Sequence, residues 1–155
     1  MSHNIQGFIF NKRETAERFS HFENAHLIDM EQGFVFIPLT NALADEIGGK
    51  EDSPYEVFWK FNPNIEALLV DNSKDGMITY LETDYWGGDG EQAAAIWYKG
   101  ILYFGPKHSK IGAISRCLKL MKAVKNDMYD EFEAIGLTKF RSNDDWIEHA
   151  NALKN

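Results

Sequence analysis

Hydrophobic and polar residues follow two different periods along this chain. In residues 77–104 the strand-like segments MITYLETDY, QAAAIWY and ILYF are separated by the short sequences GGDG and KG. Because connections this short join antiparallel neighbours, residues 77–104 predict a three-stranded meander, closed by Gly105-Pro106. Further strands are predicted at residues 5–10, 33–39 and 55–61, the last with an aromatic face formed by Tyr55, Val57, Trp59 and Phe61.

Helical patterns occur between and after these strands. Capping signals at Asn11, Thr40 and Asn62-Pro63 predict helices over residues 11–23, over residues 40–47 and from residue 62 onward. An apolar stripe predicts an amphipathic helix that buries Ile111, Ile114, Leu118 and Met121, with Cys117, Leu120 and Val124 beside it. A short helix is predicted over residues 129–135, ended by Gly136, and a last one from Ser142 or Asn143 that buries Trp146, Ile147, Ala150 and Leu153.

These elements together indicate the fold class. Helices and strands interleave, and the clearest strands are joined by short turns, which is typical of an α+β protein. We therefore expect a single domain over residues 1–155, with a mainly antiparallel sheet of about five or six strands covered by four to six helices. The apolar fraction of 44% and the aromatic fraction of 14% supply enough material for a core.

Charge and cysteine content narrow the classes of partner. The net charge of -8 disfavours nonspecific binding to nucleic acid or to an anionic membrane and favours encounter with basic partners. Cys117 is the single cysteine, so it forms no internal disulfide, and we expect it to be buried. The chain shows no signal-peptide pattern and no apolar run of the ~18 residues that a membrane helix needs. We expect a cytoplasmic protein without a cofactor.

The stretch TDYWGGDGEQ holds the best candidate site. Asp84, Tyr85, Trp86, Asp89 and Glu91 place two large aromatic side chains among three acids. Aromatic anchors within a polar, charged rim are typical of protein interfaces. These five residues are therefore the predicted binding site for a protein with a basic surface.

Other interpretations of the same loop remain open. It is also interpretable as a solvated turn, because Asp89-Gly90 is a turn dipeptide. Glu82 and Asp84 share one face of the predicted strand, as a pair of acids in a glycoside hydrolase would require. A metal site is not expected, because the regular D-x-D-x-D-G spacing of a calcium loop is absent. A phosphate loop is disfavoured, because the GxxxxGK[ST] spacing is absent and the flanks are acidic.

A second feature is a basic segment. Residues 107–125 hold six Lys or Arg residues and no acid, so this segment carries a charge of +6. Because the net charge of the chain is -8, the remaining residues together carry -14. Arg116, Lys119, Lys122 and Lys125 recur at steps of three, which predicts a secondary basic face on a helix. The face is either ordinary solvated surface or a docking site for an acidic partner. A second copy of this chain is one such partner, so a homo-oligomer is possible, whereas nucleic acid is disfavoured by the surrounding charge.

Two functional hypotheses follow from these features. The first is a non-catalytic acidic binding protein, for example a bacterial immunity or inhibitor protein that neutralises a basic toxin or enzyme. The alternative is a small hydrolase that uses Glu82 and Asp84 beside the acidic loop. The shape of the surface at the loop separates them, because substrate sites are more concave than protein interfaces.

Overall fold

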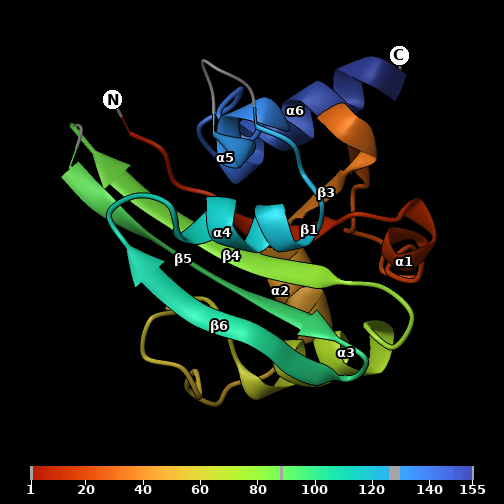
Figure 1. Ribbon diagram of the computed structural model, residues 1–155. Coiled ribbons are helices and arrows are strands. Elements are labelled where there is room, and N and C mark those ends of the chain that lie inside the picture. The colour runs from red at the N-terminus through yellow and green to blue at the C-terminus, as the bar shows by residue number, and fades with distance from the viewer. Residues whose placement is uncertain (1, 88, 126–129, 155) are drawn as a thin grey trace.

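The computed structural model describes residues 2–87, 89–125 and 130–154. Within these residues the chain forms one antiparallel sheet with the strand order β2-β3-β1-β4-β5-β6, together with six α-helices (Figure 1). The predicted α+β class is confirmed, as are the predicted ranges for the numbers of strands and helices.

The elements have the following bounds. The strands are β1 (Gln6–Phe10), β2 (Ile28–Asp29), β3 (Val35–Pro38), β4 (Ile78–Trp86), β5 (Asp89–Tyr98) and β6 (Ile101–Ser109). The helices are α1 (Arg13–Glu17), α2 (Asn41–Ile47), α3 (Pro63–Asn72), α4 (Ala113–Leu120), α5 (Glu131–Ala134) and α6 (Asn143–Lys154), with a 3-10 turn η1 at Glu31–Gly33.

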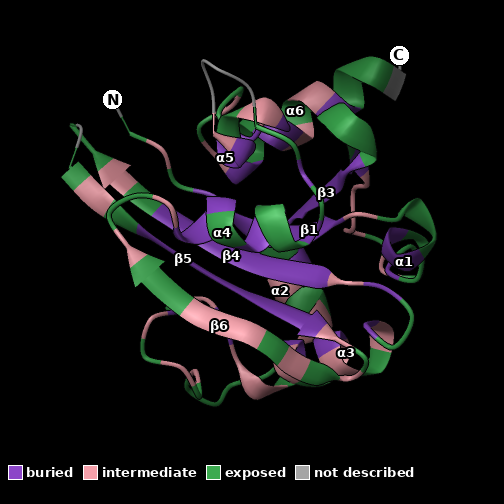
Figure 2. Ribbon diagram, in the orientation of Figure 1, coloured by how far each residue is buried: buried purple, intermediate pink, exposed green. Residues whose placement is uncertain are grey.

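A hydrophobic core lies on each face of the sheet. On one face, α4, α5 and α6 pack through residues such as Ile114, Phe132 and Trp146 against strand residues such as Leu81. On the other face, Leu43, Ile65 and Leu69 from α2 and α3 pack against Tyr80, Ala95 and Trp97. Figure 2 shows that the central strands are buried, whereas β6 and the tip of the β4–β5 hairpin carry partly exposed and exposed residues. The sheet is therefore closed by helices on both sides except toward this hairpin and β6.

The predicted meander is confirmed and is longer than expected. Lys99 and Gly100 connect β5 to β6 with φ values of 57° and 75°, the positive pair that a tight hairpin turn needs. Gly105-Pro106 does not close the meander, because β6 continues to Ser109. Gly105 instead adopts a φ of 87° where the β5–β6 register shifts, which is typical of a β-bulge.

Two of the three predicted amino-terminal caps are confirmed. Thr40 Oγ1 accepts a hydrogen bond from the Leu43 amide at 3.1 Å, and Asn62 Oδ1 accepts one from the Ile65 amide at 2.9 Å. The prediction for Asn11 is wrong: α1 begins at Arg13 and ends at Glu17, and Asn11 Nδ2 donates to the Met121 carbonyl at 3.3 Å. Asn11 thus joins the segment after β1 to the end of α4, instead of capping a helix that reaches Glu23.

The predicted strand at residues 55–61 is wrong. These residues form an irregular segment, called here the aromatic loop, in which Phe58 and Phe61 are buried and Trp59 is half exposed. The amides of Trp59 and Lys60 do not join a strand ladder. They donate to Glu82 Oε1 and Oε2, each at 2.9 Å. A side chain from β4 thereby takes the place of the backbone partner that a strand would have used.

Glu82 is the buried anchor of the aromatic loop. Its side chain is fully buried, and Oε2 also accepts a hydrogen bond from the Tyr80 hydroxyl at 2.6 Å. Burial raises the pKa of Glu82, while the three donors and the nearby ammonium of Lys60 oppose that rise. Lys60 Nζ in turn donates to the Leu39 carbonyl at 2.6 Å. The carboxyl group therefore ties the aromatic loop to the centre of the sheet.

The burial predicted for the carboxyl half needs correction. α4 covers Ala113–Leu120, so Ile111 before it and Val124 after it lie outside the helix and are exposed. On α6, Leu153 is exposed and Ile147 is only partly buried. Ile114, Leu118 and Met121 are buried as predicted, and so is Cys117. α5 covers Glu131–Ala134, and Gly136 follows it with a φ of 97°. The predicted start of this helix at Tyr129 lies outside the described residues.

The anchoring role of Glu82 is testable by the substitution Glu82→Ala. The substitution orphans three donors, the Trp59 and Lys60 amides and the Tyr80 hydroxyl. An orphaned buried donor costs about 1–3 kcal/mol, and here the Tyr80 hydroxyl is buried while the two amides are partly buried. We therefore expect the free energy of unfolding to fall by about 2 kcal/mol or more. Urea denaturation measures it. Asp84→Ala, at the next position on the same face of β4, is the matched control and should change stability by less than about 1 kcal/mol because Asp84 is exposed. Equal effects of the two substitutions would contradict the anchoring role.

Candidate functional site

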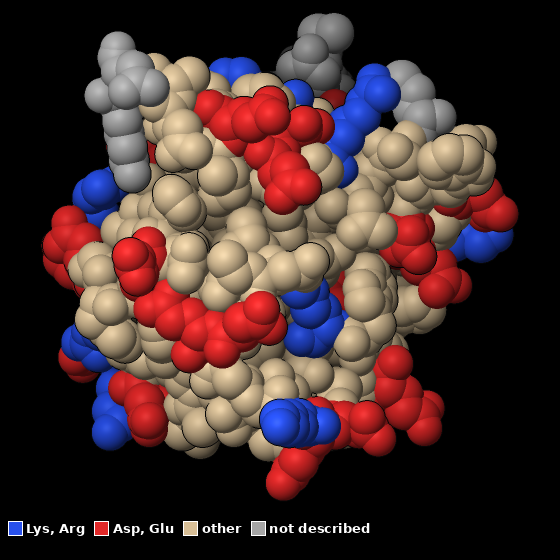
Figure 3. Space-filling view, turned by 180° about the vertical axis from the view of Figure 1, so that it is seen from behind, with Lys and Arg blue, Asp and Glu red and all other residues tan. Residues whose placement is uncertain are grey.

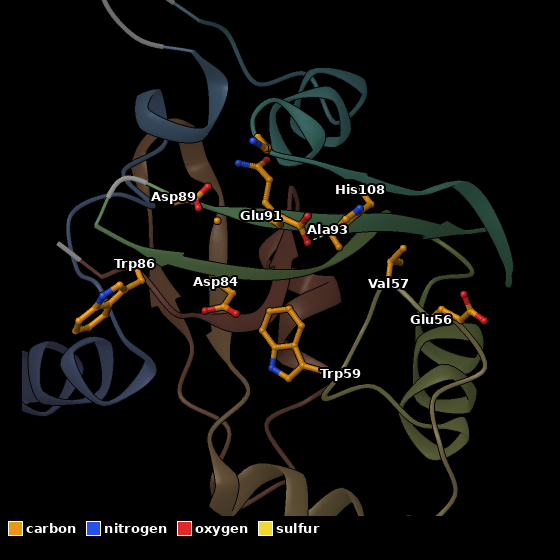
Figure 4. A pocket seen from close by; sticks show the side chains of 12 residues that line it. Glu56, Val57, Trp59, Asp84, Trp86, Asp89, Glu91, Ala93 and His108 are labelled. Carbon is orange, nitrogen blue, oxygen red and sulfur yellow. Dashed lines mark hydrogen bonds and ion pairs between the residues drawn. The ribbon is translucent and has the colours of Figure 1, made fainter.

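A cleft of about 750 Å³ opens where the β4–β5 hairpin meets the aromatic loop (Figure 4). It lies on the sheet face that α2 and α3 cover. Its lining includes Glu56 and Trp59 of the aromatic loop, Asp84, Trp86, Asp89 and Glu91 of the hairpin, and His108 and Lys110 at the end of β6. Residues distant in the sequence thus surround one concavity.

Strand alternation decides which predicted site residues reach the cleft. Asp84 and Trp86 line it, and Asp89 and Glu91 face them from β5. Tyr85 lies between Asp84 and Trp86 and therefore points to the opposite face. Its hydroxyl donates to the Lys110 carbonyl and accepts from Gln92 Nε2 at 2.8 Å. Four of the five predicted site residues therefore come together, and Tyr85 braces the hairpin from behind.

The amino-terminal segment also braces the hairpin. The amide of His3 donates to the Tyr85 carbonyl at 3.0 Å, and the amide of Tyr85 donates to the His3 carbonyl at 2.9 Å. The His3 ring lies 2.8 Å from Thr83 Oγ1 through Nδ1 and 3.3 Å from the Leu137 carbonyl through Nε2. Burial lowers the pKa of His3. The side of β4 that faces away from the cleft is thus held in place by a neutral histidine.

The cleft carries excess negative charge. Four carboxylates and one lysine line it, so its formal charge is -3 when His108 is neutral. Glu91 Oε2 lies 2.7 Å from His108 Nε2, and Figure 4 shows these two side chains pointing toward each other. Asp84 and Glu91 are direct cross-strand partners, an arrangement of like charges that destabilises a sheet. A cationic group in the cleft would relieve this repulsion.

Two exposed indole rings flank these acids. Trp86 is 78% exposed and Trp59 is 53% exposed, and in Figure 4 Asp84 lies between them. Trp86 belongs to the predicted site, whereas Trp59 was predicted to lie on the apolar face of a strand. The signal that was available is the spacing of Tyr55, Phe58 and Phe61 at steps of three, which leaves Trp59 off the buried side of the loop.

Glu82 and Asp84 do not form a pair of catalytic acids in the cleft. They lie on the same face of β4, as predicted, but Glu82 is fully buried beneath the aromatic loop and does not line the cleft. Its carboxyl oxygens already accept three hydrogen bonds. A substrate in the cleft would therefore meet Asp84, Asp89 and Glu91 but not Glu82. The Glu82–Asp84 pair is thus not available for a hydrolase, whereas the concave shape of the cleft is a feature of substrate sites.

The predicted basic helical face is interrupted. Arg116 and Lys119 lie on α4 and are exposed, but Lys122 follows the helix with a φ of 74° and Lys125 lies further along the chain. The chain turns away at this point, and the Gln32 side chain accepts from the Val124 amide at 2.8 Å and donates to the Val124 carbonyl at 2.7 Å. All four basic residues are exposed, but they do not share one helix.

Two further properties concern only the part of the chain that the structure describes. No three His, Cys, Asp or Glu side chains are grouped there in a way that would hold a metal ion. None of the helices there has the length and apolar character needed to span a bilayer. The groups that the cleft offers to a ligand include carboxylates, indole rings, an imidazole and an ammonium group.

Comparison with protein-family models, with curated proteins and with solved structures finds no match to this chain.

The repulsion between Asp84 and Glu91 gives a prediction for stability. Asp84→Asn keeps the size of the side chain and removes one of the two opposed charges, so we expect the free energy of unfolding to rise by about 0.2–1 kcal/mol. Chemical denaturation of the purified variant checks this value. Asp52→Asn, in the exposed loop before the aromatic loop, is the control and should leave stability unchanged. A loss of stability in Asp84→Asn would show that the repulsion between Asp84 and Glu91 does not lower the free energy of unfolding.

The buried His3 predicts a stability change with pH. Its pKa in the folded protein lies below the ordinary value of 6.5, so the unfolded chain binds the proton more strongly. The stabilisation from neutral His3 is therefore fully present above pH 6.5. It is lost as the pH falls from 6.5 through the lower pKa that His3 has in the folded protein. We expect His3→Gln to lose less stability than the wild type over this interval, as measured by urea denaturation at successive pH values. Parallel curves for the two proteins would refute this role.

Proposed function

We propose that this protein is a non-catalytic binding domain whose acidic cleft receives basic side chains of a partner protein. The observation that carries the proposal is the pairing of a -3 cleft with two exposed tryptophans. Carboxylates accept hydrogen bonds from Arg and Lys, and indole faces attract the same cations. The two kinds of group therefore favour one class of ligand.

A protein ligand fits this surface better than a small anion or a nucleic acid. A phosphate group would meet four carboxylates and a single lysine in the cleft. Trp and Arg are the residues that most often dominate the binding energy of protein interfaces, and large exposed indoles supply contact area at little entropic cost. An arginine or lysine side chain on the partner is therefore the favoured occupant.

The charge of the whole molecule supports the same conclusion. The residues outside 107–125 together carry a charge of -14, which makes the net charge of the chain -8. Figure 3 shows several groups of Asp and Glu side chains on the face opposite to that of Figure 1. Such a field accelerates association with a basic protein, most strongly at low salt. One concrete form of the proposal is an immunity or inhibitor protein, in which the acids occupy the basic site of a toxic enzyme in place of its anionic substrate.

Capture of a partner by matched variants tests the proposal. Tagged wild-type protein, Asp84→Asn/Glu91→Gln and Trp86→Ala are incubated at low salt with lysate of the source organism, and bound proteins are eluted by a salt gradient. We expect the wild type to retain a basic protein that the double variant retains at least about tenfold less and that Trp86→Ala retains less well, because hot-spot truncation costs about 2 kcal/mol or more.

A charge-matched control separates the cleft from net charge. Glu14→Gln/Asp71→Asn also removes two exposed acids, one on α1 and one on α3, away from the cleft. This control should retain the partner like the wild type. Equal loss in the two double variants would assign the retention to nonspecific charge and would overturn the proposed role of the cleft.

A further inference from the structure

A second, smaller pocket adjoins the acidic cleft. It has a volume of about 240 Å³ and lies where the segment before β1 meets the start of α2 and the start of α6. Its lining is rich in amide and hydroxyl groups and includes Asn4, Gln6, Thr40, Asn41, Lys60 and Asn143. Among the described residues that line it, Lys60 and Asp144 are the charged ones, so their formal charges sum to zero, in contrast to the cleft.

Two contacts join the pockets. Asn4 lines the second pocket, and its Nδ2 donates to Oδ1 of Asp84 in the cleft at 3.4 Å. Trp59 lines the cleft and the adjacent Lys60 lines the second pocket. Because the amides of both residues are held by Glu82, one short segment of the aromatic loop borders the two pockets at once.

The strand register places polar residues in a row that runs through both pockets. Asp84 pairs with Glu91. Continuing the Gln92–Ser109 pairing by one residue beyond the end of β6 sets Lys110 across from Glu91, and both residues line the cleft. On the other side, the His3–Tyr85 bridge sets Asn4 opposite Asp84, and Asn4 itself bridges to Ser142. The row is therefore Lys110, Glu91, Asp84, Asn4 and Ser142. Its four steps across the sheet span ~19 Å at ~4.8 Å between strands.

The second pocket suits a neutral polypeptide backbone. Gln6 and Asn143, which are buried in it, bond to each other. Asn143 Nδ2 donates to Gln6 Oε1 at 3.1 Å, and the backbone amide of Gln6 donates to Asn143 Oδ1 at 3.1 Å. Lys60 Nζ is engaged by the Leu39 carbonyl. Asn4 and Asn41 are exposed at its rim. Asn4 Oδ1 accepts from Gln6 Nε2 at 2.6 Å and Asn4 Nδ2 donates to Asp84, which leaves its side chain one further donor and one further acceptor. A peptide group presents the complementary acceptor and donor.

We propose that the cleft and the second pocket are one groove that binds an extended segment of the partner protein. A row of ~19 Å matches about six residues at ~3.3 Å per residue. One basic side chain enters the cleft between the indole rings, and the backbone on one side of it lies over Asn4 and Asn41. This inference rests on the proposed function and adds that the ligand is an extended segment of a protein.

Titration with synthetic peptides tests the groove on the intact chain. The short probe is N-acetyl Gly-Arg-Gly amide, which fills only the cleft. The long probes are N-acetyl Gly-Arg-Gly-Ser-Gly-Ser amide and its reversed sequence, because the row does not fix the direction of the segment. Binding is followed in the ¹⁵N-labelled protein through the indole signals of Trp59 and Trp86 and the side-chain amide signals of Asn4 and Asn41.

All probes should shift the indole signals, and at least one long probe should also shift both asparagine amides. That probe should bind about five- to tenfold more tightly than the short probe, because the two additional polar anchors each contribute a modest net hydrogen bond. In Asn4→Ala/Asn41→Ala the long and short probes should bind with equal affinity. The two probes are compared within the variant, because Asn4 also donates to Asp84 in the cleft. Asn151→Ala, exposed near the end of α6, is the matched control and should keep the full gain.

The two proposals fail in different ways in this experiment. Equal affinities for short and long probes, with indole shifts but no asparagine shifts, would overturn the groove and leave the cation-binding cleft standing. Absence of indole shifts with every probe would overturn the cleft and the groove together. A gain that survives in Asn4→Ala/Asn41→Ala would also overturn the groove, because the second pocket would then not be its source.

Discussion

A single buried carboxyl group connects the sheet to the surface that surrounds the cleft. Glu82 leaves water entirely, which is costly for a carboxylate, and the Trp59 amide, the Lys60 amide and the Tyr80 hydroxyl compensate with hydrogen bonds. These bonds determine where the aromatic loop can lie. The position of the Trp59 indole, and with it one side of the cleft, follows from the hydrogen-bonding needs of a residue that does not line the cleft.

The cleft combines rigid supports with an unfavourable arrangement of charge. The β4–β5 hairpin is held from behind by Tyr85 and His3, so the cleft face can present acids and an exposed indole without losing its shape. Asp84 and Glu91 oppose each other across the strands, although the sheet itself gains nothing from like charges at that position. Local rules of stability are most often broken at functional sites, and this conflict is consistent with a surface that is completed by a cation.

Much of the fold was predictable from the sequence because local signals determine it. The Lys99-Gly100 turn, the Thr40 and Asn62 caps and the alternation along β4 and β5 each depend on neighbours in the chain. The aromatic loop was not predictable in this way. Its alternating pattern resembles a strand, but its amides bond to the Glu82 side chain, which is distant in sequence. The same tertiary contact explains why Trp59 was missed in the site and why Glu82 was offered as a catalytic acid. Tyr85 was placed in the site although strand alternation, which puts Glu82 and Asp84 on one face, puts Tyr85 on the opposite face.

Amide hydrogen exchange of the unmodified protein tests most directly the claim that Glu82 holds the aromatic loop. The amides of Trp59 and Lys60 lie outside every helix and strand, so they have no ladder to protect them. If the Glu82 carboxyl group holds them, they should exchange as slowly as the amides in the centre of β4. Exchange as fast as that of the exposed Glu51 and Asp52 amides would contradict the claim, and the cleft would then lack a fixed wall on the side of Trp59.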